Sequence, residues 1–85
     1  MILRHNKTKV YFSDYCIHCS NLKEWLRKND IPFTALNTED PEVSKELADR
    51  GVQAIPFTVI TNEETGETQE IVGFHKSKFE EIFSL

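Results

Sequence analysis

The sequence predicts a single α/β domain in which a mixed four-stranded sheet is flanked by three helices. Segments with strand-like composition and segments with helical apolar spacing follow one another in the order strand, helix, strand, helix, strand, strand, helix. The strand–helix–strand unit at the start implies a parallel pair with a right-handed crossover, and the short turn between the last two strands implies an antiparallel hairpin. Because 85 residues are too few for two independent cores, we expect residues 1–85 to form one domain.

The first strand and the first helix meet at a pair of cysteines. The segment TKVYFS is rich in β-branched and aromatic residues and predicts a strand from about Lys9 to Ser13. From Cys16 the apolar spacing becomes helical, and Pro32 should end this helix near NDIP because proline disfavours helical geometry at the preceding residue. The expected buried face consists of Leu22, Trp25 and Leu26, and the expected polar face of Lys23, Glu24, Arg27 and Lys28.

The second strand and the second helix are predicted from PFTALN and EDPEVSKELADRGV. Asp40 can cap this helix, Pro41 suits its first turn, and Gly51 suits a left-handed exit. The expected buried stripe of the helix consists of Val43, Leu47 and Ala48.

The last three elements form a hairpin followed by a helix. IPFTVIT predicts a third strand and ETQEIVGF a fourth, and the polar turn NEETGE that joins them offers Gly66 for a positive φ. The closing helix is predicted from KSKFEEIF, in which Phe79, Ile82 and Phe83 have helical spacing.

Composition excludes several classes of function. The chain has 14 acidic and 10 basic residues, a net charge of −4, and no stripe of Lys and Arg that could follow a nucleic-acid backbone. No apolar run approaches the roughly 20 residues that span a bilayer, and the opening MILRHNKTKV has no apolar stretch long enough for a secretory signal. We therefore expect a cytoplasmic protein with no membrane or nucleic-acid partner, in a compartment where thiols are kept reduced.

Cys16 and Cys19 are the chain's only cysteines, and their spacing suits reversible redox chemistry. At a helix start, a Cys-x-x-Cys pair lies one turn apart on one face, close enough to form a disulfide without unwinding the helix. Cys16 faces the unpaired N–H groups and the positive end of the helix dipole, which stabilise a thiolate. We therefore expect Cys16 to attack a disulfide and Cys19 to resolve the resulting mixed disulfide.

Other interpretations of the cysteine pair stay open at this point. Both residues could be small buried hydrophobes, or they could hold zinc or an iron–sulfur cluster. A zinc site needs about four ligands, and no second Cys-x-x-Cys or His-x₃₋₅-His motif accompanies His5, His18 and His75. His18, between the cysteines, is either an exposed polar residue or a cation that favours the Cys16 thiolate, and Asp14 acts in the opposite direction.

The dipeptide formed by Ile55 and Pro56 is a second signal. Proline can simply begin a strand, but with a Cys-x-x-Cys upstream we expect a cis-proline loop that faces the dithiol. The backbone of Ile55 would then be free to pair with an extended substrate segment.

With CIHC, AIPF and VGF in place, the chain resembles the glutaredoxin and NrdH-redoxin branch of the thioredoxin superfamily over nearly its whole length. The resemblance implies a thioredoxin-like fold, with Cys16 as nucleophile, Cys19 as resolving thiol and Pro56 as the cis-proline. Gly73 and Phe74 would border the site. The full set of substrate-binding residues expected around the dithiol is Tyr15, His18, Ile55, Pro56, Gly73 and Phe74.

Departures from the family pattern bear on the electron donor. Cys-Ile-His-Cys replaces the Cys-Pro-Tyr-Cys common in glutathione-dependent members, Ser13 stands where a basic residue is frequent, and a Gly-Gly-x-Asp motif that grips glutathione is missing after Gly73. These differences favour the NrdH type, whose members are reduced by thioredoxin reductase and NADPH. However, Ile71 and Val72 replace that branch's Trp-Ser, and a glutathione-dependent dithiol glutaredoxin remains the alternative.

The expected function is therefore a monomeric dithiol–disulfide oxidoreductase without a bound cofactor. Its substrates would be proteins that contain disulfides, and the resemblance implies ribonucleotide reductase as one of them. A metal or iron–sulfur module built on the same cysteines is the alternative from another functional class.

Overall fold

The structure, a computed structural model, describes residues 6–83 and confirms the predicted order of elements. His5 and the rest of residues 1–5 lie outside the described residues, as do residues 84–85. The elements are β1 (Asn6–Phe12), α1 (Ile17–Lys28), β2 (Thr34–Asn37), α2 (Pro41–Asp49), β3 (Phe57–Asn62), β4 (Thr68–Val72) and α3 (Lys76–Phe83).

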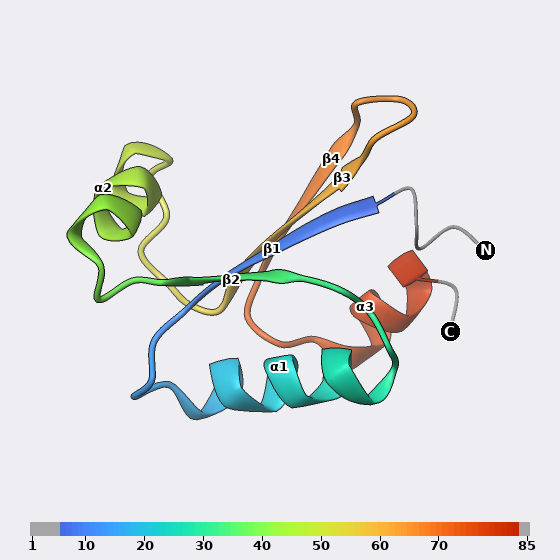
Figure 1. Cartoon of the computed structure of the whole chain (residues 1–85), viewed down its shortest axis with the longest axis horizontal. Coiled ribbons are helices and arrows are strands. Elements are labelled where there is room, and N and C mark those ends of the chain that lie inside the picture. The colour runs from blue at the N-terminus through green and yellow to red at the C-terminus, as the bar shows by residue number, and fades with distance from the viewer. Residues whose placement is uncertain (1–5, 84–85) are drawn as a thin grey trace.

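The four strands form one mixed sheet in the order β2-β1-β3-β4. β1 is parallel to β2 and antiparallel to β3, and β3 is antiparallel to β4. The helices α1 and α3 lie on one side of the sheet and α2 lies on the other, as Figure 1 shows. At the carboxyl end of the central strand β1, the chain passes through a short loop into α1.

Successive side chains of the central strands point to opposite faces and fill two cores. The larger core, under α1 and α3, contains Val10, Phe12, Cys19, Leu22, Leu26, Ile31, Ile60, Ile71, Phe79 and Phe83. The smaller core, under α2, contains Tyr11, Leu47, Phe57 and Val59. Cys19 thus belongs to the hydrophobic core, one helical turn from the start of α1.

Strand boundaries differ from the predicted ones where pairing between strands decides them. β1 begins at Asn6 rather than near Lys9, because Asn6 pairs with Asn62 of β3. β1 ends at Phe12 rather than Ser13, and β2 begins only at Thr34, which is paired with Lys9. These limits depend on residues that are distant in the sequence, so local composition does not reveal them.

The second helix starts as predicted, but part of its expected buried stripe is wrong. The Asp40 side chain accepts a hydrogen bond from the backbone N–H of Glu42 at 2.9 Å, and Pro41 is the first helical residue. Leu47 is buried and Val43 is half-buried, whereas Ala48 is exposed. The nine-residue helix therefore contacts the sheet through a narrower stripe than its apolar spacing indicates.

None of the helices within residues 6–83 has the length and apolar character needed to cross a membrane.

Candidate functional site

The sulfur of Cys16 caps the first helix. Cys16 is the N-cap residue of α1 with an extended backbone, and its Sγ accepts a hydrogen bond from the backbone N–H of Cys19 at 3.1 Å. The sulfur thus occupies the capping position that an Asp or Ser oxygen occupies in most helices. The first turn of α1 contains no acidic residue. A helix N-terminus favours negative charge on its capping atom, and here that atom is a thiol sulfur.

The two thiols lie in different environments. Both are free, Cys16 is half-buried, and Cys19 has no exposed surface. Burial, together with the hydrogen bond and the charge of Cys16, raises the pKa of Cys19 from 9.0 to about 12. Cys16 is therefore the thiol that solvent can reach, and Cys19 is held protonated beneath it.

The loop that precedes β3 lies at the same end of the sheet as the carboxyl end of β1, and it approaches Cys16. The peptide bond between Ile55 and Pro56 is cis, as the sequence predicts. The Cys16 thiol points at the carbonyl oxygen of Ile55, with 3.9 Å between Sγ and O. The expected partners Cys16, Ile55 and Pro56 are thus brought together by segments 39 residues apart.

Gly73 joins this cluster from the end of β4. Its φ of +88° lies in the left-handed region, and its backbone N–H donates to the carbonyl of Pro56 at 2.7 Å. Phe74, by contrast, turns into an aromatic cluster: its ring centroid lies 6.1 Å from that of Trp25 and 5.9 Å from that of Phe79. Its half-buried ring therefore packs against the core.

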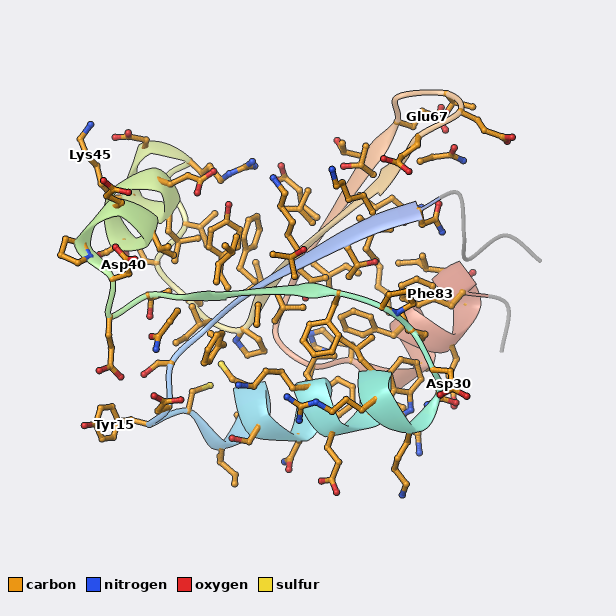
Figure 2. The ribbon with its side chains drawn as sticks, viewed as in Figure 1. Tyr15, Asp30, Asp40, Lys45, Glu67 and Phe83 are labelled. Carbon is orange, nitrogen blue, oxygen red and sulfur yellow. The ribbon has the colours of Figure 1, made fainter. Side chains whose placement is uncertain are left out.

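Tyr15 and His18 lie on the solvent side of the dithiol. Tyr15 is 89% exposed and projects away from the body of the protein, as Figure 2 shows. Its backbone N–H is held by the hydroxyl of Ser13 at 3.2 Å. His18 is exposed on the first turn of α1, and Ile17 beside it is 67% exposed. These side chains form an open rim rather than a closed pocket.

Thr38 and Lys23 both contact Phe12 near the site, and the sequence does not predict either contact. Thr38 donates to the carbonyl of Phe12 from both its backbone N–H, at 2.8 Å, and its hydroxyl, at 3.0 Å, which ties the end of β1 to the chain after β2. Lys23 was expected on the polar face of α1, but its Nζ lies 3.5 Å from the centroid of the Phe12 ring. The i, i+4 spacing between Cys19 and Lys23 was available in the sequence, whereas nothing local identified Thr38.

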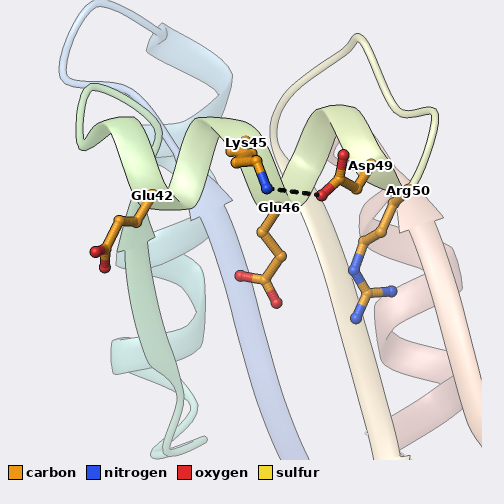
Figure 3. Close-up of a pocket in the computed structure, with 5 residues that line it drawn as sticks. All are labelled: Glu42, Lys45, Glu46, Asp49 and Arg50. Carbon is orange, nitrogen blue, oxygen red and sulfur yellow. Dashed lines mark ion pairs between the residues drawn. The ribbon is translucent and has the colours of Figure 1, made fainter.

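A shallow depression elsewhere on the surface carries no comparable chemistry. It lies on α2 and is lined by Glu42, Lys45, Glu46, Asp49 and Arg50 (Figure 3). Its ion pair between Lys45 and Asp49 spans 3.9 Å, and both side chains are mostly exposed. Exposed pairs of this kind contribute little to stability.

The described residues offer the cysteines few partners for metal binding. Residues 6–83 contain no group of three or more His, Cys, Asp and Glu side chains arranged to hold a metal ion. Two thiols of one chain fall short of the four ligands that a structural zinc site uses. The arrangement instead suits reversible formation of a bond between the two sulfurs, because the pair spans one helical turn.

Comparison with known proteins gives a consistent family relationship. The glutaredoxin family profile matches residues 8–64. The glutaredoxin-like proteins NrdH of Lactococcus lactis subsp. cremoris and subsp. lactis are each 34% identical to the chain over 56 residues, which cover 65% of this chain and 75% of theirs.

Solved structures show a related fold. The NrdH-redoxin of Escherichia coli superposes with a TM-score of 0.72 at 18% identity, covering 89% of this chain and 93% of the other. A glutaredoxin of Archaeoglobus fulgidus gives a TM-score of 0.71 at 18% identity, covering 89% and 84%. The fold is therefore thioredoxin-like, as the sequence predicts.

Proposed function

The chain belongs to the glutaredoxin family, a family of thiol–disulfide oxidoreductases, and we propose that it is a small dithiol redoxin of the NrdH type that reduces disulfides in other proteins. The observation that carries this proposal is the asymmetry of the pair. Cys16 is accessible at the amino end of a helix, and Cys19 is buried and protonated one turn deeper.

The first step is attack by the Cys16 thiolate on one sulfur of a client disulfide. The bond between Cys16 and that sulfur forms, the client disulfide breaks, and the second client sulfur leaves as a thiolate that takes a proton from solvent. The backbone N–H of Cys19, at 3.1 Å from Sγ, stabilises the attacking anion.

The second step is attack by Cys19 on the Sγ of Cys16. In the reduced protein, three effects raise the pKa of Cys19: burial, the hydrogen bond with Cys16 and the charge of Cys16. Once Cys16 carries the client it is uncharged, so its electrostatic effect disappears. Formation of the mixed disulfide therefore makes the Cys19 thiol easier to deprotonate, at the moment when its thiolate is needed.

The client is an extended polypeptide segment that lies across the rim of the site. The backbone of Ile55, beside Cys16, offers hydrogen bonds to such a segment in the manner of an added strand. The exposed apolar side chains of Tyr15, Ile17 and Val72 offer contacts on either side. By family resemblance, ribonucleotide reductase is the client that we propose.

The electron donor is thioredoxin reductase with NADPH. Support comes from the charge beside the dithiol, where the Ser13 hydroxyl faces the Glu39 carboxylate at 3.5 Å, a distance at the limit for a hydrogen bond. A carboxylate at this corner disfavours the negatively charged tripeptide glutathione.

A coupled assay tests this proposal. NADPH oxidation is followed with a protein disulfide as substrate, using either thioredoxin reductase or glutathione with glutathione reductase, and the Cys16→Ser variant serves as the control. We expect turnover with thioredoxin reductase, little turnover with glutathione, and none with Cys16→Ser. Turnover with glutathione alone would refute the choice of donor, and no turnover with either donor would refute the redox function.

A further inference from the structure

Lys23 holds its charge in a fixed place near the dithiol. The side chain is half-buried, and its Nζ lies 3.5 Å from the centroid of the Phe12 ring, a cation–π contact. Within residues 6–83 no carboxylate forms an ion pair with it. Among the described residues, an aromatic ring and not a carboxylate thus holds the ammonium.

Lys23 and Cys19 lie on the same side of α1. Residues i and i+4 are neighbours on a helix surface, so Lys23 follows Cys19 by about one turn of α1. Phe12 is the last residue of β1 and precedes the loop that carries Cys16. The Phe12 ring and α1 therefore hold the ammonium on the side of the helix that carries the buried thiol.

We propose that Lys23 is a positioning residue for the second half-reaction, in which its ammonium, held over Phe12, stabilises the Cys19 thiolate that resolves the mixed disulfide. This inference rests on the proposed function. The attacking residue remains Cys19, and Lys23 acts through it.

The step is balanced within the protein and its client. Cys19 loses its thiol proton, and its sulfur forms a bond with the Sγ of Cys16. The bond between Cys16 and the client sulfur breaks, and the client leaves as a thiol whose proton replaces the one lost by Cys19, by way of solvent. The two cysteines are oxidised to a disulfide, and the client disulfide is reduced by two electrons.

The charged groups around Cys19 act in opposite directions. Burial raises the pKa of Cys19 most, the hydrogen bond and the charge of Cys16 raise it further, and the charge of Lys23 lowers it by less than any of these. A backbone hydrogen bond with Ser13, in the loop before the helix, also lowers it. The other titratable groups nearby in the chain or the loops are Asp14 and His18, which are exposed, and Glu39, which accepts from the Ser13 hydroxyl. In the mixed disulfide Cys16 is neutral, and Lys23 remains the fixed charge that favours the thiolate.

The experiment separates the two half-reactions with one equivalent of the symmetric disulfide of thionitrobenzoate, which is the substrate. Attack by Cys16 releases the first thionitrobenzoate, and resolution by Cys19 releases the second, so rapid-mixing absorbance measurements between about pH 6 and about pH 10 give both rates. The variants are Lys23→Met, Lys23→Arg and, as the matched control, Lys28→Met, which removes an exposed charge from the same helix. Circular dichroism confirms that each variant is folded.

We expect Lys23→Met to slow the second release about three- to tenfold near neutral pH and to move its pH midpoint upward. The first release should change by less than about twofold, Lys23→Arg should restore the second rate, and Lys28→Met should match the wild type. Equal second rates in Lys23→Met and Lys28→Met would overturn the inference, as would equal slowing of both releases. Release of only one equivalent by the wild type would instead overturn the proposed function, and the inference with it.

Discussion

Cys16 and Cys19 are separated by one helical turn, yet only Cys16 is partly exposed to solvent. Cys19 lies among the apolar side chains under α1, which disfavour a charged sulfur. This difference in burial gives two chemically identical side chains separate roles. Cys16 is accessible to a large substrate, whereas Cys19 can react only with a sulfur that is already bound within the protein.

A second buried polar residue, Tyr11, lies on the opposite face of the sheet. Its side chain is fully buried beneath α2, and its hydroxyl finds no hydrogen-bond partner among residues 6–83. Burial and the neighbouring Glu46 carboxylate raise the pKa of Tyr11 above its usual 10.0, and Arg50 partly opposes them. Glu46 and Arg50 therefore both act on the hydroxyl, but neither lies at hydrogen-bond distance from it.

We predict that Tyr11→Phe leaves the free energy of unfolding unchanged at neutral pH or raises it by up to about 1 kcal/mol, because it removes an unpartnered buried polar group. Above pH 10 the difference should grow in favour of the variant. The unfolded chain then releases the tyrosine proton before the folded chain does, so wild-type stability falls as pH rises through the raised pKa of Tyr11.

Urea denaturation under reducing conditions measures both effects. Tyr15→Phe is the matched control, because it removes a hydroxyl from a side chain that is 89% exposed and should change nothing. Cys19, whose pKa is also raised, lowers stability in the same alkaline range in all three proteins, so it cancels in the comparison. A loss of more than about 1 kcal/mol in Tyr11→Phe would mean that the hydroxyl has a partner.

At the scale of elements, the site is formed at the ends of α1, β3 and β4 and not by their middle residues. The Cys16 sulfur caps α1, the Ile55 carbonyl precedes β3, and Gly73 follows β4. The hydrogen bond from Gly73 to the Pro56 carbonyl, at 2.7 Å, links the last two of these segments. The site is therefore assembled from the Cys16 side chain and from backbone groups next to the ends of β3 and β4.

Gly73 and Gly66 allow this role of β4 to be tested. Both have a left-handed φ, +88° and +80°, and both donate a backbone hydrogen bond of 2.7 Å. A Cβ at Gly66 would meet nothing within 4 Å, and one at Gly73 would meet only the exposed His75 ring, at 3.3 Å. We predict that Gly73→Ala and Gly66→Ala each lower the free energy of unfolding by about 1 kcal/mol.

Their effects on disulfide reduction should differ. Only Gly73→Ala disturbs the loop beside Cys16, so its rate of protein disulfide reduction should fall several-fold while Gly66→Ala keeps the wild-type rate. Full activity in both variants would exclude Gly73 from the site. An equal loss in both would show that the rate follows stability rather than the loop.

The sequence was sufficient for the order of elements, because turn residues and apolar spacing are local signals. The approach of the Pro56 loop to Cys16 was indicated by the combination of a Cys-x-x-Cys motif with a downstream proline. Beyond these two features, boundaries and exposures were set by the fold. The sequence failed where a partner is distant. The beginning of β1 at Asn6 depends on β3, and the exposure of Ala48 depends on how α2 lies on the sheet. Lys23 has a long aliphatic stem that can bend back toward an aromatic ring, which a division into polar and apolar faces does not represent.

For the molecule as a whole, the mixed sheet supports the dithiol formed by Cys16 and Cys19. Its central strands are covered on both faces, by α1 and α3 on one side and α2 on the other (Figure 1). The sheet brings the dithiol, the loop at Ile55 and the end of β4 to one place, while the rim formed by Tyr15 and Ile17 stays open. Such an open site suits a macromolecular substrate better than an enclosed small molecule.

The most direct test of the assigned roles is intact-mass analysis of Cys19→Ser after incubation with a peptide that contains one disulfide. We predict a covalent adduct of one peptide that maps to Cys16 and is released by a reducing agent, and no adduct on Cys16→Ser. An adduct that forms on Cys16→Ser but not on Cys19→Ser would contradict the assignment of Cys16 as nucleophile and Cys19 as resolving thiol.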